Sequence, residues 1–179
     1  CKTEKSLEKE KDVVDLAVQN GLRAKILNQD EIKKVEPNID INSIGAAYYY
    51  CDHHTTPGEL INELKDYIEK NGVKCITNTE IEFFEIKNNK IKSVNILNQK
   101  LIYDEYILSA GTWTSKLCNK LGIDLLLQAG KGYSINHLSK TEISCPSILV
   151  EPKCAITPMN GFTRYSGTME ISSINNRIR

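Results

Sequence analysis

The sequence lacks a long apolar run and an excess of charge of either sign. Lys and Arg together number 23, as do Asp and Glu, so the formal net charge is zero. Nucleic-acid-binding domains carry a basic face, so this balance predicts no nucleic-acid partner. The apolar runs are far shorter than the roughly 20 residues that a membrane span needs. The first dozen residues, CKTEKSLEKEKD, show no signal peptide. We therefore expect a cytoplasmic protein, with a peripheral position at the inner face of the membrane left open.

Paired metal-ligand and disulfide motifs are also missing. The six cysteines are scattered without a Cys-x-x-Cys spacing, which favours reduced thiols and no metal. His53 and His54 are adjacent, so on an extended segment their side chains would point to opposite faces. A surface turn or helix start explains them better than a metal site. No residue is recognisable as a catalytic acid or base, and the catalytic residues stay unknown.

The first fifty residues alternate helical and extended patterns. Residues 6–20 repeat apolar side chains at helical spacing, with Ser6 placed to cap the helix. An extended run at 22–27 follows, then a short helix capped by Asn28. A strand is predicted at 44–52, where aromatic side chains gather.

The clearest helix signal lies at 56–72. Thr56 occupies the N-cap position, Pro57 the first helical position and Glu59 the third. Apolar residues then recur at helical spacing up to Gly72, which can close the helix. The pattern predicts a helix from Thr56-Pro57 to about Asn71.

Extended runs fill residues 73–110. Asn88-Asn89 and Asn98-Gln99 are the turn candidates between them. These runs predict a β-meander followed by a last strand, and short antiparallel strands are predicted toward the C-terminus. The fold class is therefore α+β.

The segment YILSAGTWTSKL, residues 106–117, ends an apolar run in small residues before the only Trp of the chain. We expect a strand at 105–110, and a short helix at 114–122. Small residues at a strand end leave room for a ligand, because Gly lets another group approach the backbone closely. An ordinary strand-to-helix turn explains the same residues, and both interpretations stay open here.

Four stretches, taken in order, are similar to one known family. They are YYYCDHHTTPGELINELKDYIEKNG, NTEIEFFEIKNNKIKSVN, YDEYILSAGTWTSKLCNKLGIDLLL, and the pair QAGKGYSI and RYSGTMEI. In this order they resemble the D-amino-acid oxidase/dehydrogenase superfamily of FAD-dependent oxidoreductases, which includes glycine oxidase and sarcosine oxidase. The similarity extends from about residue 6 to 172, and KGYSI and GTMEI resemble the D-amino-acid dehydrogenase branch most.

The resemblance implies a division into domains. Residues 1–50 and 123–179 would belong to an antiparallel-sheet substrate domain. Residues 51–122 would belong to an FAD-binding domain and supply its helix, its meander and one strand. Both domains would be partial, because the chain has no Gly-x-Gly-x-x-Gly fingerprint for the FAD pyrophosphate. Ala129 also stands where the family usually has Pro.

The resemblance implies which residues lie near FAD and substrate. The turn Ala110-Gly111 would pass close to FAD, with Thr112 and Trp113 beside it. The backbone of Ile81 would lie by the adenine. Turn geometry, packing and a plain strand position are the respective alternatives. Two residues of the second half would contact substrate, namely Arg164 as a carboxylate anchor and Tyr133 as a pocket wall. An outward-facing Arg164 and a core Tyr133 remain the alternatives.

The resemblance further implies oxidation of the amine of a D-amino acid by hydride transfer to flavin, giving an imine, then a 2-oxo acid and ammonia. Oxygen or a quinone chain would accept the electrons. Glycine, sarcosine or glycerol 3-phosphate are alternative substrates, and a non-catalytic α+β interaction module is the alternative from another class. We expect the chain to be an internal fragment of such an enzyme. By itself it would be inactive, would not hold FAD, and would self-associate through exposed strand edges.

Overall fold

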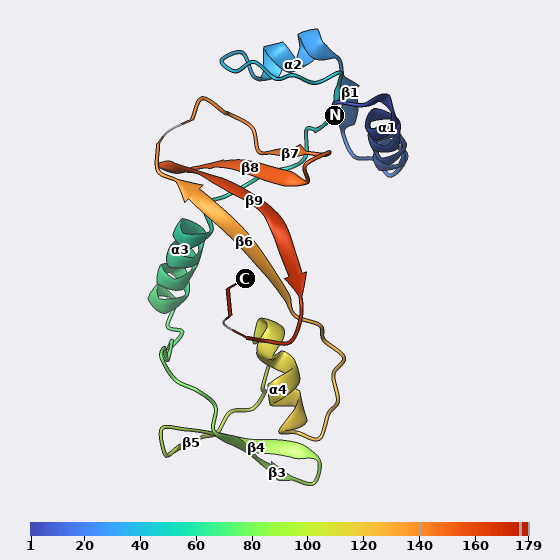
Figure 1. Cartoon of the computed structure of the whole chain (residues 1–179). Helices are drawn as coiled ribbons and strands as arrows, with labels where there is room; N and C mark the ends of the chain where they lie inside the picture. Colours follow the sequence, from blue (N-terminus) through green and yellow to red (C-terminus); the bar gives the residue numbers. More distant parts are fainter. Residues whose placement is uncertain (140, 176, 179) are drawn as a thin grey trace. The chain divides into compact units, whose positions relative to one another are not determined.

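The computed structural model describes residues 1–139, 141–175 and 177–178. The chain divides into two compact units, Cys1–Leu64 with Gly132–Met169 and Lys65–Lys131 with Glu170–Arg179. Helices and antiparallel strands are mixed along the chain (Figure 1), which confirms the predicted α+β class. The assignment of 1–50 and 123–179 to a substrate domain, and of 51–122 to an FAD domain, stays a prediction.

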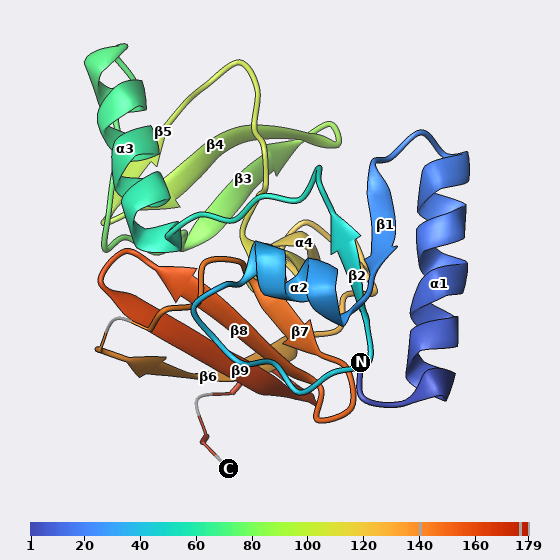
Figure 2. The same ribbon diagram turned by 90° about the horizontal axis from the view of Figure 1, so that it is seen from above.

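In the first unit, one long helix packs on a two-stranded sheet. Helix α1 (Glu4–Gln19) contacts strands β1 (Ala24–Leu27) and β2 (Ala46–Tyr49), which pair antiparallel. Figure 2 shows α1 running alongside β1. The short helix α2 (Gln29–Val35) also contacts β1. Buried apolar side chains from these elements form a small core: Val14, Leu27 and Ile32.

The caps of these helices follow local chemistry closely. Asn28 and Glu31 form a capping box at the start of α2, which confirms the predicted cap. The cap of α1 is Thr3, whose hydroxyl accepts the N–H of Ser6 at 3.2 Å, so the prediction of Ser6 as the cap is wrong. The apolar periodicity begins only at Leu7. The polar first turn of the helix therefore carried no periodic signal.

A four-stranded sheet belongs mainly to the first unit. Its order is β6 (Gly130–His137), β9 (Phe162–Ile171), β8 (Cys154–Met159) and β7 (Ser147–Leu149), and β7–β8 and β8–β9 pair antiparallel. The first two residues of β6 and the last two of β9 belong to the second unit. The short antiparallel strands predicted from the C-terminal sequence are confirmed. The glycine of the GTME motif, Gly167, has a backbone reason: a Cβ there would lie 2.8 Å from the carbonyl oxygen of Lys153.

Helix α3 (Pro57–Lys70) confirms the helix predicted at 56–71. The two residues expected to cap it, Thr56 and Glu59, make a tertiary contact, and their capping role stays a prediction. The hydroxyl of Thr56 accepts the backbone N–H of Asn160 at 3.2 Å. The carboxylate of Glu59 accepts from the side-chain amide of Asn160 at 2.6 Å. The start of α3 is thus fastened to the turn between β8 and β9.

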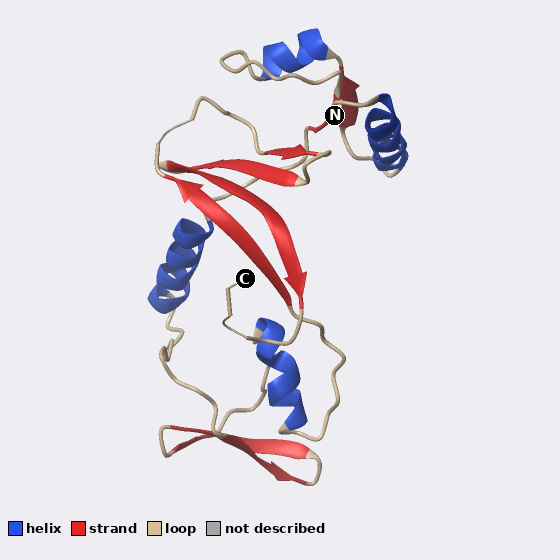
Figure 3. Ribbon diagram, in the orientation of Figure 1, coloured by secondary structure: helices blue, strands red, loops and turns tan. Residues whose placement is uncertain are grey.

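The second unit contains the predicted meander (Figure 3), made of β3 (Phe83–Lys87), β4 (Lys90–Ile96) and β5 (Gln99–Leu101) in antiparallel order. Asn88 and Asn89 turn between β3 and β4 with φ of 53° and 55°, as predicted. The second turn is Leu97-Asn98, with φ of 46° and 59°, so the prediction of Asn98-Gln99 is wrong by one residue. The pairing of Ile96 with Gln99 sets this turn.

A polar cluster holds the meander together. Ser93 is fully buried, and its hydroxyl donates to the carboxylate of Glu85 at 2.9 Å. Lys100, from β5, forms an ion pair with the same carboxylate. Lys100 first, and Ser93 second, lower the pKa of Glu85 below its usual value. One carboxylate on β3 therefore joins all three strands.

The predicted strand at 105–110 is wrong. Among the described residues, 102–110 belong to no helix or strand. Tyr106 instead anchors this segment, since its hydroxyl donates to the carbonyl of Lys92 and accepts the N–H of Tyr103. An apolar run favours extended backbone, but a β-strand also needs a neighbouring strand to which its backbone can hydrogen-bond. The described part of the chain provides none for these residues.

A short helical segment follows this extended stretch. A single 3₁₀ turn, η1 (Gly111–Trp113), leads into α4 (Thr114–Asn119), and Gly122 ends the helical region with φ of 74°. The helix is shorter than the 114–122 predicted. None of the helices in the described part of the chain combines the length and apolar composition that a membrane crossing requires.

Candidate cofactor and substrate site

The turn that begins η1 is fixed by two hydrogen bonds to Ala110. Its N–H donates to the hydroxyl of Thr114 at 3.1 Å, and its carbonyl accepts the N–H of Trp113 at 3.0 Å. Gly111 has φ of 54°, in the left-handed region that favours glycine. Backbone conformation therefore explains this glycine.

The space beside Gly111 is nevertheless open. A Cβ built there meets no heavy atom within 4 Å among the described residues. The two explanations raised by the sequence, turn geometry and room for a ligand, are therefore compatible. The proximity of Ala110 and Gly111 to FAD stays a proposal.

Ile81, the residue expected near adenine, belongs to the same unit as this turn. Its carbonyl accepts the ammonium of Lys120 at 2.8 Å, and the carbonyl of Glu82 accepts the same group at 2.9 Å. Lys120 is the C-cap residue of α4, so one side chain ties the end of that helix to the segment before β3. This link connects Ile81 structurally to the helix that follows Trp113.

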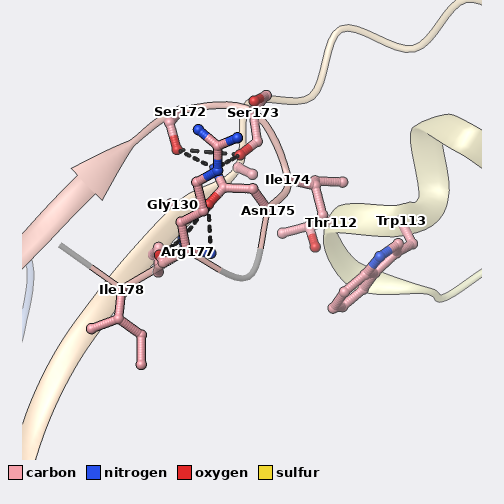
Figure 4. Close-up of a pocket in the computed structure, with 11 residues that line it drawn as sticks. Thr112, Trp113, Gly130, Ser172, Ser173, Ile174, Asn175, Arg177 and Ile178 are labelled. Atoms are coloured by element: carbon pink, nitrogen blue, oxygen red, sulfur yellow. Dashed lines mark hydrogen bonds between the residues drawn. The ribbon is translucent and has the colours of Figure 1, made fainter.

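A cavity of about 380 Å³ opens beside Thr112 and Trp113 (Figure 4). Its volume falls in the range of small-molecule sites, roughly 300–1,000 Å³. All of its lining residues belong to the second unit. They are Thr112, Trp113, Ala129, Gly130, Lys131, Ser172, Ser173, Ile174, Asn175, Arg177 and Ile178. Two of the residues singled out from the sequence thus lie on a cavity.

The charge of this cavity is one-sided. Its described lining includes Lys131 and Arg177 but no Asp or Glu. The ammonium of Lys131 donates to the side-chain oxygen of Asn175 and to the backbone carbonyl of Arg177, both at 2.7 Å. Sequence reasoning missed Lys131 as a site residue, although KGYSI contains it. The local sequence did not single it out, because the partners of its ammonium lie more than forty positions further along the chain.

Arg164 and Tyr133, the predicted substrate residues, belong to the first unit. The Nε of Arg164 donates to the side chain of Asn136 at 3.0 Å, and its guanidinium carbon lies 5.6 Å from the ring centre of Phe162. Side chains alternate between the faces of a strand, so Tyr133 and Asn136, three positions apart on β6, point to opposite faces. Arg164 shares the face of Asn136. The two predicted residues therefore cannot line one face of this sheet together.

Of the His pair, His54 lies at a second cavity, of about 370 Å³, in the first unit, and His53 is not among its lining residues. His54 lines it together with mostly polar residues, including Thr56, Ser144 and Asn160. In the described part of the chain, no group of three or more His, Cys, Asp and Glu residues is placed to hold a metal ion.

Comparison with known proteins identifies the family. A family model named DAO, described as FAD dependent oxidoreductase, matches residues 1–178. The chain belongs to this family. The D-amino acid dehydrogenase of Helicobacter pylori strain ATCC 700392 / 26695 is 30% identical over 96% of this chain and 41% of that protein. The monomeric sarcosine oxidase of Bacillus sp. strain B-0618 is 28% identical over 87% of this chain and 41% of that protein. The chain thus spans about 41% of the length of these curated DAO relatives.

Solved structures of similar fold lead to the same architecture. Glycine oxidase from Bacillus cereus ATCC 14579 superposes with a TM-score of 0.84 at 22% identity, covering 100% of this chain and 49% of that one. L-proline dehydrogenase from P. horikoshii gives a TM-score of 0.81 at 19% identity, over 93% and 47%. The chain has the fold of about half of each of these two structures.

Proposed function

We propose that this chain is part of an FAD-dependent dehydrogenase that oxidises the amine of a D-amino acid. The match of the DAO family model to residues 1–178 is the observation that carries the proposal. The name of the Helicobacter relative supports a D-amino acid as substrate. The name of the Bacillus relative supports the broader class, oxidation of an amine α to a carboxylate, and keeps sarcosine as an alternative.

The surroundings of Gly111 and Trp113 fit a planar part of FAD. The open space at Gly111 and the exposed indole of Trp113 can accept a planar group, and Thr112 adds a hydroxyl beside the cavity. Ala110, Gly111, Thr112, Trp113 and Ile81 are therefore proposed to contact FAD in the assembled enzyme. FAD, when bound, supplies the acceptor for the hydride that leaves the substrate Cα.

The protein's task in this reaction is positioning. As the Cα–H bond breaks, a C=N bond forms and the amine loses a proton, and water then converts the imine to a 2-oxo acid and ammonia. The chain has to orient the substrate through its carboxylate and exclude water. Arg164 and Tyr133 remain proposals for contacts with the substrate.

The test is a steady-state assay of the product of the gene that encodes this chain. We expect 2-oxo acid and ammonia to form from D-amino acids, with at least about a tenfold preference in kcat/KM over glycine, sarcosine and glycerol 3-phosphate. Assays with oxygen and with a soluble quinone identify the acceptor. A flavin-loaded protein that oxidises glycerol 3-phosphate but no amine would overturn the proposal. A protein that binds no flavin would favour a non-catalytic module.

A further inference from the structure

The cavity beside Trp113 holds a positive charge without a counter-ion among the described residues. Lys131 is half-buried at its wall, and both of its hydrogen-bond acceptors there are neutral oxygen atoms. Neither of these hydrogen bonds is an ion pair, unlike the contacts of Lys25 with Glu31, Lys65 with Glu69 and Lys100 with Glu85. A partly desolvated ammonium is stabilised by an anion much more than by an amide or a carbonyl.

We propose that Lys131 binds the carboxylate of the substrate in this cavity. Arg177 adds a second positive charge to the lining, and no acidic side chain opposes an anion in the described lining. Ile174 supplies apolar surface for the remainder of a small ligand, on the same cavity as Thr112 and Trp113, the residues proposed to contact FAD. Figure 4 shows Ile174 beside Thr112, with Trp113 next along the chain.

Lys131 is better placed than Arg164 for this role. The Nε–H of Arg164 donates to the side-chain oxygen of Asn136, and its guanidinium lies over the ring of Phe162. Arg164 lines neither of the two cavities described above. Lys131 lines a cavity of about 380 Å³ that also contains Trp113. The proposal rests on the proposed function only in identifying the carboxylate as that of an amino acid.

The single Trp of the chain provides a test that needs neither flavin nor turnover. The 179-residue protein is titrated with 4-methylpentanoate while Trp fluorescence is followed, and 4-methylpentanamide is the neutral probe of the same shape. We expect a saturable change with the carboxylate alone. Lys131→Gln, which can keep hydrogen bonds but not charge, should weaken binding at least about tenfold, and Lys131→Arg should largely retain it.

Lys116→Gln is the matched control. Lys116 is exposed on α4, three residues from Trp113, and does not line the cavity. Its loss should leave the titration unchanged. Equal responses to acid and amide, or equal losses in the Lys131 and Lys116 variants, would overturn the proposal. Thermal unfolding curves of each variant show whether the fold is kept, and Lys131→Arg tests the site even if Lys131→Gln does not fold.

A second experiment uses the flavin-loaded gene product. Lys131→Gln should lower kcat/KM by about 30- to 1000-fold while the flavin content per mole stays constant. Loss of flavin in Lys131→Gln, or a comparable loss of kcat/KM in Arg164→Met with none in Lys131→Gln, would overturn the assignment. If the gene product takes no flavin at all, the proposed function fails, but the fluorescence titration still decides the role of Lys131.

Discussion

Gly111 and Gly122 have similar backbone conformations but different surroundings. Their φ angles are 54° and 74°, and a Cβ at either position meets no heavy atom within 4 Å among the described residues. Alanine at either position therefore costs the strain of a left-handed backbone, about 1–2 kcal/mol. Gly111 lies next to Thr112 at the cavity, whereas Gly122 closes the region of α4.

Comparing alanine variants at these two glycines distinguishes the effect of backbone strain from the effect of contact with the cofactor. In the flavin-binding gene product, Gly111→Ala should lower flavin absorbance per mole of protein, because a methyl group enters the space proposed for FAD. Gly122→Ala should lower the Tm similarly and leave the flavin content unchanged. If both variants keep their flavin, turn geometry alone explains Gly111.

Folding lowers the pKa of the Glu151 carboxyl. Its carboxylate accepts the backbone N–H of Lys2 at 2.7 Å and that of Thr3 at 3.3 Å. The hydrogen bond from Lys2, above all, lowers the pKa of Glu151 from 4.5 to about 2. Because the folded state has the lower pKa, this contribution to stability is complete above pH 4.5 and is lost as the pH falls toward 2.

We therefore expect the Tm of the chain to fall between pH 5 and about pH 2. In Glu151→Gln that fall should be shallower, since the neutral amide cannot gain a proton there. Glu8→Gln, on the exposed face of α1, is the control. Identical pH profiles for the chain and for Glu151→Gln would contradict the role given to this carboxylate.

At the scale of elements, two glycines on neighbouring strands test how β9 packs. A Cβ at Gly167 would lie 2.8 Å from the carbonyl of Lys153, which is backbone and cannot move cheaply, whereas a Cβ at Gly132 on β6 meets no atom within 4 Å. Gly167→Ala should destabilise the protein by about 1–3 kcal/mol. Gly132→Ala should be neutral or slightly stabilising. Urea denaturation of the two variants provides the comparison. Equal free energies of unfolding would mean that the β7–β8 turn, which contains Lys153, moves to make room for the added methyl group.

Elements whose signals are local were predictable from the sequence. The helix at 57–70 has Pro57 at its first position and apolar residues at helical spacing, and the meander turns at two asparagines. The segment 105–110 was mispredicted because pairing depends on a partner that local sequence does not reveal. Thr56 and Glu59 fit a helix cap, yet their contact with Asn160 depends on a turn a hundred residues away.

The candidate site was predictable only in part. Motif resemblance led to Thr112 and Trp113, and both line the cavity. Lys131 could be recognised only from the structure. Its ammonium is bound by two neutral oxygens, the side-chain oxygen of Asn175 and the backbone carbonyl of Arg177. Those residues lie more than forty positions further along the chain.

At the scale of the whole molecule, affinity for FAD depends on its phosphates as well as its ring. The pyrophosphate of a dinucleotide is normally held by N–H groups at a glycine-rich helix start. The 179 residues contain no Gly-x-Gly-x-x-Gly sequence. Their proposed contacts, at Ile81 and at Ala110 to Trp113, offer shape and backbone groups.

We therefore expect the 179-residue chain not to bind FAD at concentrations up to about 10 μM, which corresponds to less than about 7 kcal/mol of binding free energy. Titration of FAD with the protein, followed by flavin fluorescence, measures this directly. Saturable quenching at low micromolar concentration would locate a phosphate site within these residues.

The β8–β9 turn, which binds the start of α3 through Asn160, contains a sequence that degrades chemically with time. Asn160 precedes Gly161. In Asn-Gly pairs the next backbone nitrogen can attack the side-chain carbonyl and expel ammonia, which leaves a cyclic succinimide. Water then opens this ring to aspartate or isoaspartate. The amide that now donates to Glu59 would become a carboxylate facing another carboxylate, so an attractive contact would turn repulsive. Each stored molecule would thus lose the link between α3 and the β8–β9 turn with age, at a rate that rises with pH and that peptide mass spectrometry of aged samples can follow.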